Sequence, residues 1–315
     1  MKILVTGGAG FIGSALAKRL VQDGHEVVVI DNFNDYYDVS LKRTRQDIFL
    51  KGTEVIEGSI TDETFLRTVF AAHAFDVVCH LAAQAGVRYS SENPSLYVET
   101  NVRGTQLILE MMREFGIKRM VYASTSSVYG NETVVPFKED HPANKPVSIY
   151  AATKRAGELL AHTYASLYGM EITCLRFFTV YGPWSRPDMA MLKFAHLIVE
   201  GKPIDIYNNG KLRRDWTHID DIVEGFVCAV EKPLGYEIIN LGNGSPVELL
   251  SFVELLEKEF DTTAQKNMLP MQEGDVYETY ADTNKARELL GFETKIDLTD
   301  GVRTFVDWYK DFYRK

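Results

Sequence analysis

Near the start of the chain stands the sequence Thr6-Gly7-Gly8-Ala9-Gly10-Phe11-Ile12-Gly13. An apolar run at 2–6 precedes it, and a helical pattern of apolar residues at 12–23 follows it. Gly7, Gly10 and Gly13 have the spacing G-x-x-G-x-x-G, which lets the backbone turn sharply and approach a pyrophosphate at the positive end of the helix. Such a turn is also found as a plain strand-to-helix connection, so its context decides between the two interpretations.

The next apolar run supplies that context. It covers residues 26–31 and ends in Asp31, 18 residues after Gly13. A carboxylate at this place accepts hydrogen bonds from the adenosine ribose hydroxyls and repels a 2′-phosphate. The sequence therefore predicts a dinucleotide site that takes NAD rather than NADP.

The first half of the chain alternates between short apolar runs and helical patterns. Continuous runs rich in Val and Ile are typical of strands that are buried on both faces of a parallel sheet. The strands are expected at 2–6, 26–31, 77–81, 120–124 and 172–177, and the helices at 12–23, 64–73, 94–115 and 150–167. This order predicts an α/β fold of the Rossmann type, with a doubly wound parallel sheet.

The alternation loosens after about residue 180, where turn residues separate the helical stretches. We expect a cofactor-binding domain at 1–180 and a smaller, irregular α/β substrate lobe formed by the remainder of 181–315. A strand at 237–241 can return to the large sheet, so residues 216–242 are assigned to the first domain.

Composition excludes several classes of protein. The chain has 315 residues, of which 45% are hydrophobic and 25% charged, which is typical of a globular protein. The formal net charge of −10 disfavours a nucleic acid or an anionic membrane as partner. No apolar run is long enough to span a membrane, and the three cysteines have no metal-ligand spacing. A cytoplasmic protein without a metal is the expectation.

Tyr150 and Lys154 lie four residues apart at the start of a predicted helix and so share one face. A nearby ammonium group and the positive nicotinamide ring of NAD both favour the phenolate, which would lower the pKa of Tyr150 and make it a base. Taken alone, such a pair is more often an exposed pair on an amphipathic helix. After a nucleotide-binding turn, catalysis becomes the better interpretation.

Hydroxyl side chains cluster at 124–127, at the carboxyl end of a predicted strand. Ligands of open α/β sheets bind at these ends. Thr125 is therefore a candidate for holding the reacting hydroxyl near Tyr150. The alternative is that these Ser and Thr residues only end the strand and cap a turn.

Together, these motifs resemble the extended short-chain dehydrogenase/reductase superfamily, in particular its nucleotide-sugar branch. The resemblance covers essentially the whole chain and extends to His80-Leu81-Ala82-Ala83, to 101–105 and to Arg176-Phe177-Phe178. In this branch the segment matching 214–221 carries an arginine that binds the sugar-nucleotide diphosphate, and the loop matching 272–275 reaches the diphosphate and the uridine ribose.

The resemblance implies a set of site residues. Tyr150, Lys154 and Thr125 are the implied catalytic residues. The cofactor residues are Gly7, Gly10, Phe11, Ile12, Gly13, Asp31, Asn32, Ile60, Leu81, Ala82, Ala83, Lys154 and Phe177. The substrate residues are Arg88, Ser126, Ser127, Tyr150, Thr179, Arg186, Arg214, Gln272 and Asp275.

Three stretches are similar to UDP-glucuronate 4-epimerases within that branch, namely 34–38, 85–90 and 181–190. Some positions depart from the superfamily pattern. Ser59 stands where an aspartate usually contacts adenine, Gln272 where UDP-galactose 4-epimerases usually carry an arginine, and Glu273 and Tyr277 where prolines are usual. These departures are expected to change affinity and not the type of reaction.

The resemblance implies that UDP-glucuronate is converted to UDP-galacturonate through a 4-keto sugar, with transient transfer of hydride to bound NAD. Decarboxylases and dehydratases of the superfamily place acidic residues beside the catalytic Ser or Thr, where this chain has Ser126-Ser127. UDP-glucose/UDP-galactose 4-epimerisation remains the main alternative. A UDP-glucuronate decarboxylase and a non-catalytic dinucleotide sensor rank lower.

Some interpretations stay open at the level of sequence. Tyr36, Tyr37, Trp184 and Trp216 are either packing aromatics or site residues, and Arg88 is either a structural ion-pair residue or a substrate contact. By analogy with the superfamily, the predicted helices at 94–115 and 150–167 form a four-helix interface in a homodimer.

Overall fold

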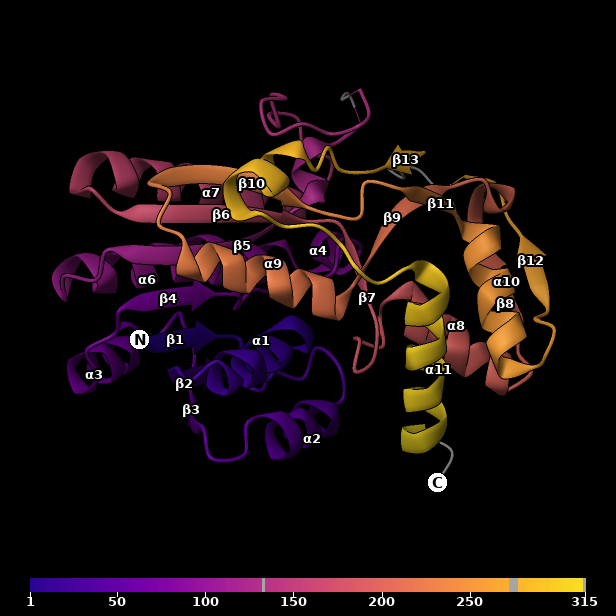
Figure 1. Cartoon of the computed structure of the whole chain (residues 1–315), viewed down its shortest axis with the longest axis horizontal. Coiled ribbons are helices and arrows are strands. Elements are labelled where there is room, and N and C mark those ends of the chain that lie inside the picture. Colours follow the sequence, from indigo (N-terminus) through magenta and orange to yellow (C-terminus); the bar gives the residue numbers. More distant parts are fainter. Residues whose placement is uncertain (132–133, 272–276, 314–315) are drawn as a thin grey trace.

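The computed structural model describes residues 1–131, 134–271 and 277–313, and within them the largest element is a parallel sheet of seven strands. The strand order is β3-β2-β1-β4-β5-β6-β10 (Figure 1). The strands are β1 (Lys2–Thr6), β2 (Glu26–Asp31), β3 (Glu54–Glu57), β4 (Val77–His80), β5 (Arg119–Thr125), β6 (Glu171–Phe177) and β10 (Tyr236–Leu241). The order runs outward from β1 in both directions, so the predicted doubly wound Rossmann-type sheet is confirmed.

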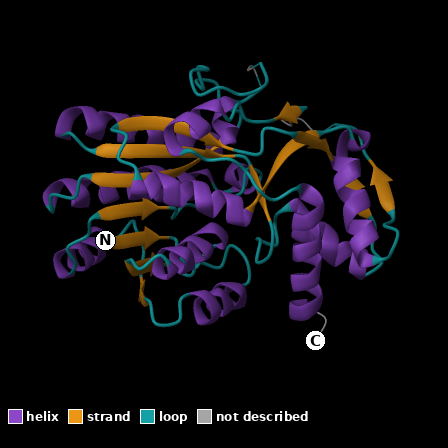
Figure 2. Ribbon diagram, viewed as in Figure 1, coloured by secondary structure: helices purple, strands orange, loops and turns teal. Residues whose placement is uncertain are grey.

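Helices cover both faces of this sheet (Figure 2). One face carries α1 (Phe11–Gln22), α2 (Val39–Phe49) and α9 (Ile219–Glu231). The other face carries α3 (Glu63–Ala72), α6 (Gly104–Glu114) and α7 (Ile149–Tyr168). The sheet is therefore buried on both sides, which explains why its strands are apolar at almost every position.

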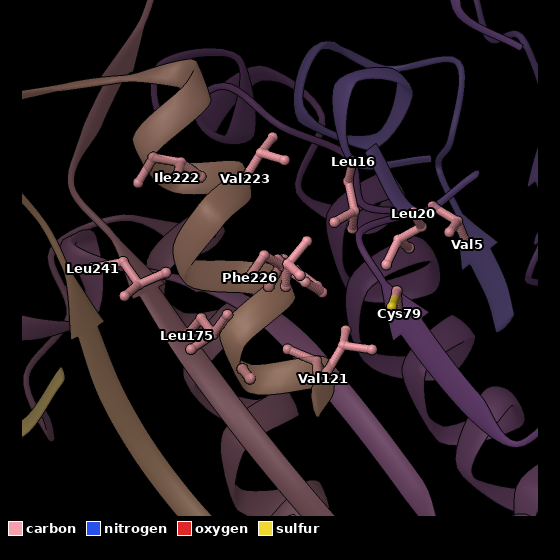
Figure 3. Packing of buried hydrophobic residues seen from close by; sticks show 14 of the residues in the cluster. Val5, Leu16, Leu20, Cys79, Val121, Leu175, Ile222, Val223, Phe226 and Leu241 are labelled. Atoms are coloured by element: carbon pink, nitrogen blue, oxygen red, sulfur yellow. The ribbon is translucent and has the colours of Figure 1, made fainter. Parts of the chain in front are cut away.

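Alternate residues of each strand supply the two apolar layers. In β1, Val5 packs with Leu16 of α1 and Phe226 of α9 on one face, whereas Leu4 belongs to the layer on the other face. Figure 3 shows the first layer, in which α9 lies across the strands. Strand residues alternate between faces because successive side chains of a strand point in opposite directions.

The predicted helix at 94–115 is divided into segments. It consists of α5 (Pro94–Tyr97), the π-helical turns η1 (Val98–Arg103) and α6, and the short helix α4 (Tyr89–Glu92) precedes it. Within η1, Asn101 accepts a hydrogen bond from the Gln84 backbone N–H at 2.7 Å and donates one to the Gln84 carbonyl at 3.0 Å. The wider turn thus fixes the segment that follows β4.

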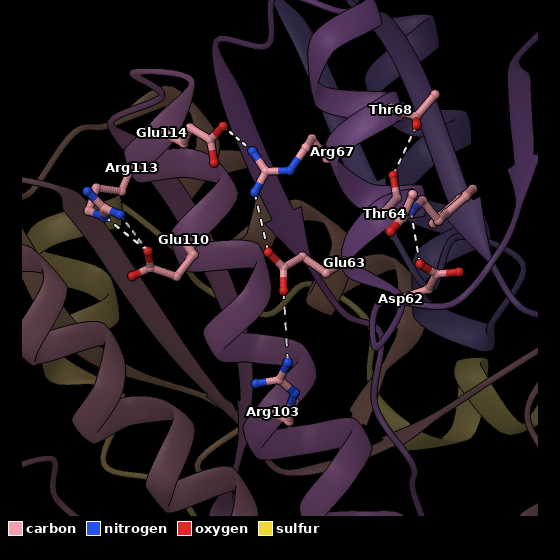
Figure 4. Close-up of polar contacts among 10 residues, drawn as sticks. Asp62, Glu63, Thr64, Arg67, Thr68, Arg103, Glu110, Arg113 and Glu114 are labelled. Atoms are coloured by element: carbon pink, nitrogen blue, oxygen red, sulfur yellow. Dashed lines mark hydrogen bonds and ion pairs between the residues drawn. The ribbon is translucent and has the colours of Figure 1, made fainter.

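Ion pairs on the surface connect α3 with the η1–α6 segment (Figure 4). Arg67 of α3 contacts both Glu114 of α6 and Glu63 of its own helix, and Glu63 also lies 4.0 Å from Arg103. The Asp62 carboxylate caps α3 by accepting from the Phe65 N–H at 3.0 Å, so the helix begins one residue before the expected 64. Exposed pairs of this kind add about 1 kcal/mol at most to stability.

A smaller part of the molecule is built on β9 (Arg213–His218), which pairs with β7 (Thr179–Tyr181), β11 (Pro246–Glu248) and β13 (Glu278–Thr279). A separate pair joins β8 (Ile204–Ile206) to β12 (Lys266–Met268). The helices of this part are α8 (Ala190–Val199), α10 (Leu249–Phe260) and α11 (Leu298–Tyr313), with the short turns η3 (Tyr207–Gly210) and η4 (Ala286–Leu290) elsewhere in the second half. Its apolar core includes Trp216, which stacks on Phe252 with ring centroids 4.1 Å apart.

The chain passes between the two parts more than once. After β9 it forms α9, which packs on the large sheet, and then β10, which pairs with β6 over residues 236–241 and 172–177. Only then does it return to form β11 and α10. The two parts are therefore interleaved along the sequence.

Candidate active site

A cavity of about 460 Å³ lies at the carboxyl ends of the large sheet. Its lining includes Gly7 after β1, Asp31 at the end of β2, Leu81 after β4, Thr125 at the end of β5 and Phe177 at the end of β6. β1 and β4 mark the point from which the strand order runs in opposite directions, and open α/β sheets bind their ligands at such a point.

The glycine turn forms one wall of this cavity. Gly7 has a φ of +72°, and a Cβ there would lie 2.7 Å from the Ala82 backbone nitrogen, while a Cβ on Gly13 would lie 2.2 Å from the Gly7 carbonyl oxygen. Gly10 has an ordinary φ of −71°, and a Cβ there would lie 3.0 Å from the Gly7 carbonyl oxygen, the one atom within 4 Å in the part of the chain that the structure describes. Because Gly10 also lines the cavity, a side chain there would take up cavity space after a small adjustment of the turn.

The first turn of α1 begins at this wall, and no side chain caps it. Its backbone N–H groups are free to donate, and the helix dipole favours negative charge at this end. Glycines at the close approach and uncapped N–H groups are what a dinucleotide pyrophosphate requires. The residues present therefore fit this group.

Asp31 lies beside the turn and is held by two backbone donors. Its Oδ2 accepts from the Ala9 N–H at 3.0 Å and its Oδ1 from the Phe33 N–H at 2.9 Å. An ionised carboxylate has about four acceptor positions, so further positions remain for ribose hydroxyls. The other predicted cofactor residues that line the cavity are Phe11, Ile12, Asn32, Ile60, Leu81, Ala82, Ala83 and Phe177.

Ser59 has its own partner. Its hydroxyl lies 2.8 Å from the hydroxyl of Thr61, and its neighbours Gly58 and Ile60 line the cavity. The departure at position 59 is thus accommodated within the loop that follows β3.

The predicted proton-transfer residues lie in the same cavity. Ser148 caps α7 by accepting from the Ala151 N–H at 3.1 Å, which starts the helix just before Tyr150 and places Lys154 one turn later. Thr125 ends β5, and its hydroxyl accepts from the Ser127 N–H at 3.2 Å. Helix and strand therefore bring Tyr150, Lys154 and Thr125 to one wall, as the sequence predicted.

Opposing effects act on the pKa of Tyr150. Burial raises it above the ordinary value, while the charge of Arg186 and a hydrogen bond with Thr125 lower it, and the net direction is upward. The predicted lowering by the Lys154 ammonium and by the nicotinamide ring of bound NAD stays a prediction; among the side chains that shift the pKa of the phenol here, the cation is Arg186. Desolvation of the ring outweighs that attraction.

Lys154 is buried at the bottom of this wall, with its Nζ 4.2 Å from the centroid of the Tyr122 ring. Burial lowers its pKa to about 7, and the charge of Glu158 one turn further along α7 raises it. Glu158 is fully buried and accepts hydrogen bonds from Ser124 at 2.5 Å and from Arg176 at 2.8 and 2.9 Å. The Glu158 carboxylate is thus held in place one helical turn from Lys154, on the side away from Tyr150 along α7.

The predicted substrate residues divide into three groups. Ser126 and Ser127, on the short turn η2 (Ser126–Tyr129), line the cavity together with Tyr150, Thr179 and Arg186. Arg88 and Arg214 lie outside its lining. Gln272 and Asp275 lie outside the described residues.

The two arginines outside the lining belong to neighbouring segments. The Arg88 guanidinium carbon lies 5.5 Å from the centroid of the Tyr207 ring, which belongs to η3. Arg214 lies on β9 and donates to the Arg213 and Tyr277 carbonyls at 3.0 and 3.4 Å. Both side chains are thus associated with the smaller part of the molecule.

The cavity also holds residues that the sequence prediction missed, above all Asp188. Arg186 and Asp188 form a bidentate ion pair, and the Tyr36 hydroxyl donates to Asp188 at 3.2 Å. Burial opposes the charge on Asp188, but Arg186 and Tyr36 hold its pKa below the ordinary range. Further residues in the lining are Asn34, Tyr37, Lys42 and Gln84.

The aromatic residues left open by the sequence fall into two classes. Tyr36 and Tyr37 line the cavity, whereas Trp216 packs in the core of the smaller part and Trp184 packs against Trp308 and Phe312 of α11. The similarity of 34–38 to a known family was the signal that could have identified the two tyrosines.

Among residues 1–131, 134–271 and 277–313, no three His, Cys, Asp or Glu side chains come together as metal ligands. In the same part of the chain, no helix has both the length and the apolar character that crossing a membrane requires.

Comparison with known proteins adds independent evidence. The chain is 44% identical over 336 residues to a probable UDP-glucuronate 4-epimerase of Rhizobium meliloti, covering all of this chain and 98% of that protein. Its structure superposes with a TM-score of 0.92 on the crystal structure of UDP-glucuronic acid 4-epimerase from Bacillus cereus in complex with UDP-glucuronic acid and NAD. That pair shares 37% identity and covers 99% of this chain and all of the other.

A second epimerase structure is similar as well. UDP-glucose 4-epimerase from Thermotoga maritima with UDP-glucose superposes with a TM-score of 0.91, at 32% identity and 99% coverage of both chains. The family model described as NAD dependent epimerase/dehydratase family matches residues 3–242, which include the glycine turn, Asp31, Tyr150 and Lys154. The chain therefore belongs to the NAD dependent epimerase/dehydratase family.

Proposed function

We propose that this protein converts UDP-glucuronate to UDP-galacturonate by NAD-dependent epimerisation at C4. The observation that carries this proposal is that one cavity brings together the glycine turn, the pair Tyr150 and Lys154, and a cationic Arg186. The similarity to UDP-glucuronate 4-epimerases over the full chain supports the same substrate.

NAD fits the cofactor end of the cavity. The Asp31 carboxylate, already held by two backbone donors, would accept the adenosine ribose hydroxyls and repel a 2′-phosphate. The glycine turn and the uncapped start of α1 would hold the pyrophosphate. When bound, NAD supplies reversible hydride acceptance at C4, so that the reaction has no net redox change.

Tyr150 is the proposed base for the sugar 4-hydroxyl. Arg186 and the Thr125 hydroxyl both favour its phenolate and so oppose the effect of burial. Thr125 lies at the end of β5, where its hydroxyl can relay the proton for either epimer at C4. Lys154, which is buried on the same helix face, would hold the nicotinamide ribose.

The C5 carboxylate is proposed to contact Arg186 with the neutral donors Thr125, Ser126, Ser127 and Thr179. A site that pairs buried donors with a carboxylate rejects an analogue without it, since the donors then lose their partner. The 4-keto intermediate is a β-keto acid and prone to lose carbon dioxide. Donors that hold its carboxylate in place favour epimerisation over decarboxylation.

Besides Asp31 at the cofactor end, a second acidic side chain, Asp188, lies in the cavity, contrary to what the hydroxyl cluster alone suggested. Asp188 is kept ionised by Arg186 and Tyr36, so it is a poor proton donor at neutral pH. Glu158 is fully buried behind Ser124 and paired with Arg176. Neither carboxylate is therefore placed to serve as the acid of an elimination or a decarboxylation.

We also propose a homodimer, in which η1, α6 and α7 of two copies form a four-helix interface. Several apolar side chains on these helices and on α5 are exposed, namely Leu96, Val98, Leu159 and Leu167. A second copy would cover them. The molar mass in solution, measured by light scattering, tests this: a monomer at micromolar concentration contradicts it.

The division into domains and the cellular location remain proposals as well. The cofactor domain at 1–180 with 216–242 is supported by α9 and β10, which both pack on the large sheet. A cytoplasmic location is supported by the three cysteines, Cys79, Cys174 and Cys228, which form no disulfide with one another.

The decisive experiment is to incubate the purified protein with UDP-glucuronate without added cofactor and to separate the products by chromatography with mass detection. A new peak of unchanged mass that runs as UDP-galacturonate supports both the epimerisation and tightly held NAD. A product lighter by carbon dioxide contradicts the proposal. If the protein converts UDP-glucose to UDP-galactose and leaves UDP-glucuronate unchanged, the alternative function, UDP-glucose/UDP-galactose 4-epimerisation, replaces the proposed one.

A further inference from the structure

Arg45 is a buried cation that the proposed reaction does not use. It lies on α2 and has no solvent exposure, and among the described residues it forms no ion pair with a carboxylate. Guanidinium stays protonated in proteins, and burial lowers the Arg45 pKa without a nearby acid to compensate. A buried, unpaired charge is unfavourable for stability, which points to a function for this side chain.

The partners of Arg45 come from three separate segments. Its Nη1 donates to the Tyr37 hydroxyl at 2.8 Å and to the Ala9 carbonyl at 3.4 Å, and its Nη2 donates to the Trp184 and Ser185 carbonyls at 2.6 and 3.4 Å. These are the glycine turn, the loop after β2 and the loop before α8. All three segments line the cavity at neighbouring positions.

Trp184 adopts a left-handed backbone conformation that residues other than glycine rarely take, with a φ of +65°. Its ring is held by Phe49 of α2 on one side and by Trp308 and Phe312 of α11, with centroid distances of 5.5, 5.3 and 4.8 Å. Such a conformation persists only where the surroundings impose it. The Arg45 bond to the Trp184 carbonyl is part of that constraint.

The constrained segment leads directly to Arg186, two residues further on, whose guanidinium faces the cavity and pairs with Asp188. We propose that Arg45 is a positioning residue: it ties the Trp184-Ser185-Arg186 segment to the glycine turn and thereby sets how strongly the site prefers a sugar with a C5 carboxylate. This inference rests on the proposed function, in which Arg186 contacts that carboxylate.

A merely structural role makes a different prediction. If Arg45 only filled space and supported the fold, its loss would weaken the binding of a carboxylate sugar and of a neutral sugar alike. If it positions Arg186, its loss weakens the binding of the carboxylate sugar alone, because the binding of UDP and of the neutral parts of the sugar does not depend on Arg186.

The test measures Kd for UDP-glucuronate and for UDP-glucose on NAD-loaded protein, with Tyr150→Phe present throughout to prevent turnover. For Arg45→Met we expect UDP-glucuronate to bind about tenfold more weakly, which is about 1.4 kcal/mol, and UDP-glucose to change less than about twofold. Arg45→Lys keeps the charge but not the two-pronged geometry, so it should recover part of the loss.

Arg43→Met is the matched control. Arg43 lies on the same helix, is partly exposed, pairs with Glu57 at 2.7 Å and lies over the Phe33 ring, away from the loop before α8. It should leave both affinities unchanged. NAD content and melting temperature are recorded for each variant, and Arg45→Lys carries the test if Arg45→Met does not fold.

If the Arg45 variants bind both sugars equally more weakly, or bind neither more weakly, the inference is overturned while the proposed function stands. If protein with Tyr150 intact fails to convert UDP-glucuronate, the proposed function fails first. The inference fails with it, because Arg186 then has no substrate carboxylate for which Arg45 could position it.

Discussion

Arg186 and Asp188 face each other inside the cavity through two hydrogen bonds, from Nε to Oδ1 and from Nη2 to Oδ2, each 2.9 Å long. Burial opposes the positive charge of Arg186, but Asp188 raises the pKa of Arg186 above the ordinary value. Arg186 is thus fully cationic and already oriented toward a carboxylate. A carboxylate on the substrate would meet a donor of the right shape and charge.

Replacing Arg186 by glutamine should separate the two classes of substrate. A hydrogen bond to a charged group contributes about 1.5–3 kcal/mol, so the Kd for UDP-glucuronate should rise about tenfold to a hundredfold. UDP-glucose lacks the carboxylate, so its Kd should change less than about twofold. Calorimetry on NAD-loaded protein measures both, and an equal loss for the two sugars would contradict a role in carboxylate recognition.

Asp188→Asn should have the opposite effect. The amide keeps the shape and the contact with Tyr36 but removes a negative charge that repels an anionic sugar and competes for Arg186. We expect the KM for UDP-glucuronate to fall about fivefold, which is about 1 kcal/mol. A rise in KM would show that Asp188 chiefly orients Arg186.

Tyr150→Phe should abolish most turnover without releasing the cofactor. General base catalysis contributes about a hundredfold to ten-thousandfold, so kcat should fall by at least about a hundredfold. NAD content, measured by absorbance after denaturation, should be unchanged. Tyr168→Phe, at the exposed end of the same helix, is the control and should keep normal activity. Near-normal turnover of Tyr150→Phe would eliminate Tyr150 as the base.

Lys154→Met should alter how stability depends on pH. The folded pKa of about 7 lies below the unfolded value of about 10.4, so between these pH values the unfolded chain binds more protons. In nucleotide-free protein, the free energy of unfolding of the unmodified chain should therefore rise relative to that of the variant by about 1.4 kcal/mol for each unit of increasing pH in that window. Below pH 7 the difference between the two should stay constant. Urea titrations across the window measure this, and a constant difference would mean that Lys154 has an ordinary pKa.

Gly10→Ala should weaken cofactor binding with only a small effect on the fold. The φ of −71° suits alanine, the added methyl group would lie 3.0 Å from the Gly7 carbonyl oxygen, and Gly10 lines the cavity next to the start of α1. We expect NAD to bind at least about tenfold more weakly, since the backbone can no longer approach the pyrophosphate. The free energy of unfolding of the nucleotide-free variant should stay within about 1 kcal/mol of the unmodified protein, because the tight contact with Gly7 and the stiffer unfolded chain have opposite effects. Normal NAD affinity would contradict the placement of the pyrophosphate.

Local patterns carried most of what the sequence predicted. The glycine turn, Asp31, and the pair Tyr150 and Lys154 each depend on residues close along the chain, and the structure places all of them on one cavity. The doubly wound sheet followed from the alternation of apolar runs with helical patterns, and the topology and the similar structures confirm it.

What the sequence did not reveal depends on the path of loops. Tyr36, in the loop after β2, meets Asp188, in the loop before α8, and Arg45 of α2 binds Tyr37 and the Trp184 carbonyl of the same two loops. The net upward direction of the Tyr150 pKa likewise depends on the burial of its ring, and the spacing of residues along the sequence does not show burial. The π-helical turns around Asn101 were also invisible, since their apolar pattern matches an ordinary helix.

The late return of β10 has a consequence during synthesis on the ribosome. β6 is made by residue 177, yet its outer edge stays unpaired, and the apolar side of α1 stays uncovered, until α9 and β10 emerge more than fifty residues later. During that interval the nascent chain exposes a sheet edge and an apolar helix face, both of which promote aggregation. Stalled or truncated products ending between β6 and β10 should therefore be the forms that most need a chaperone.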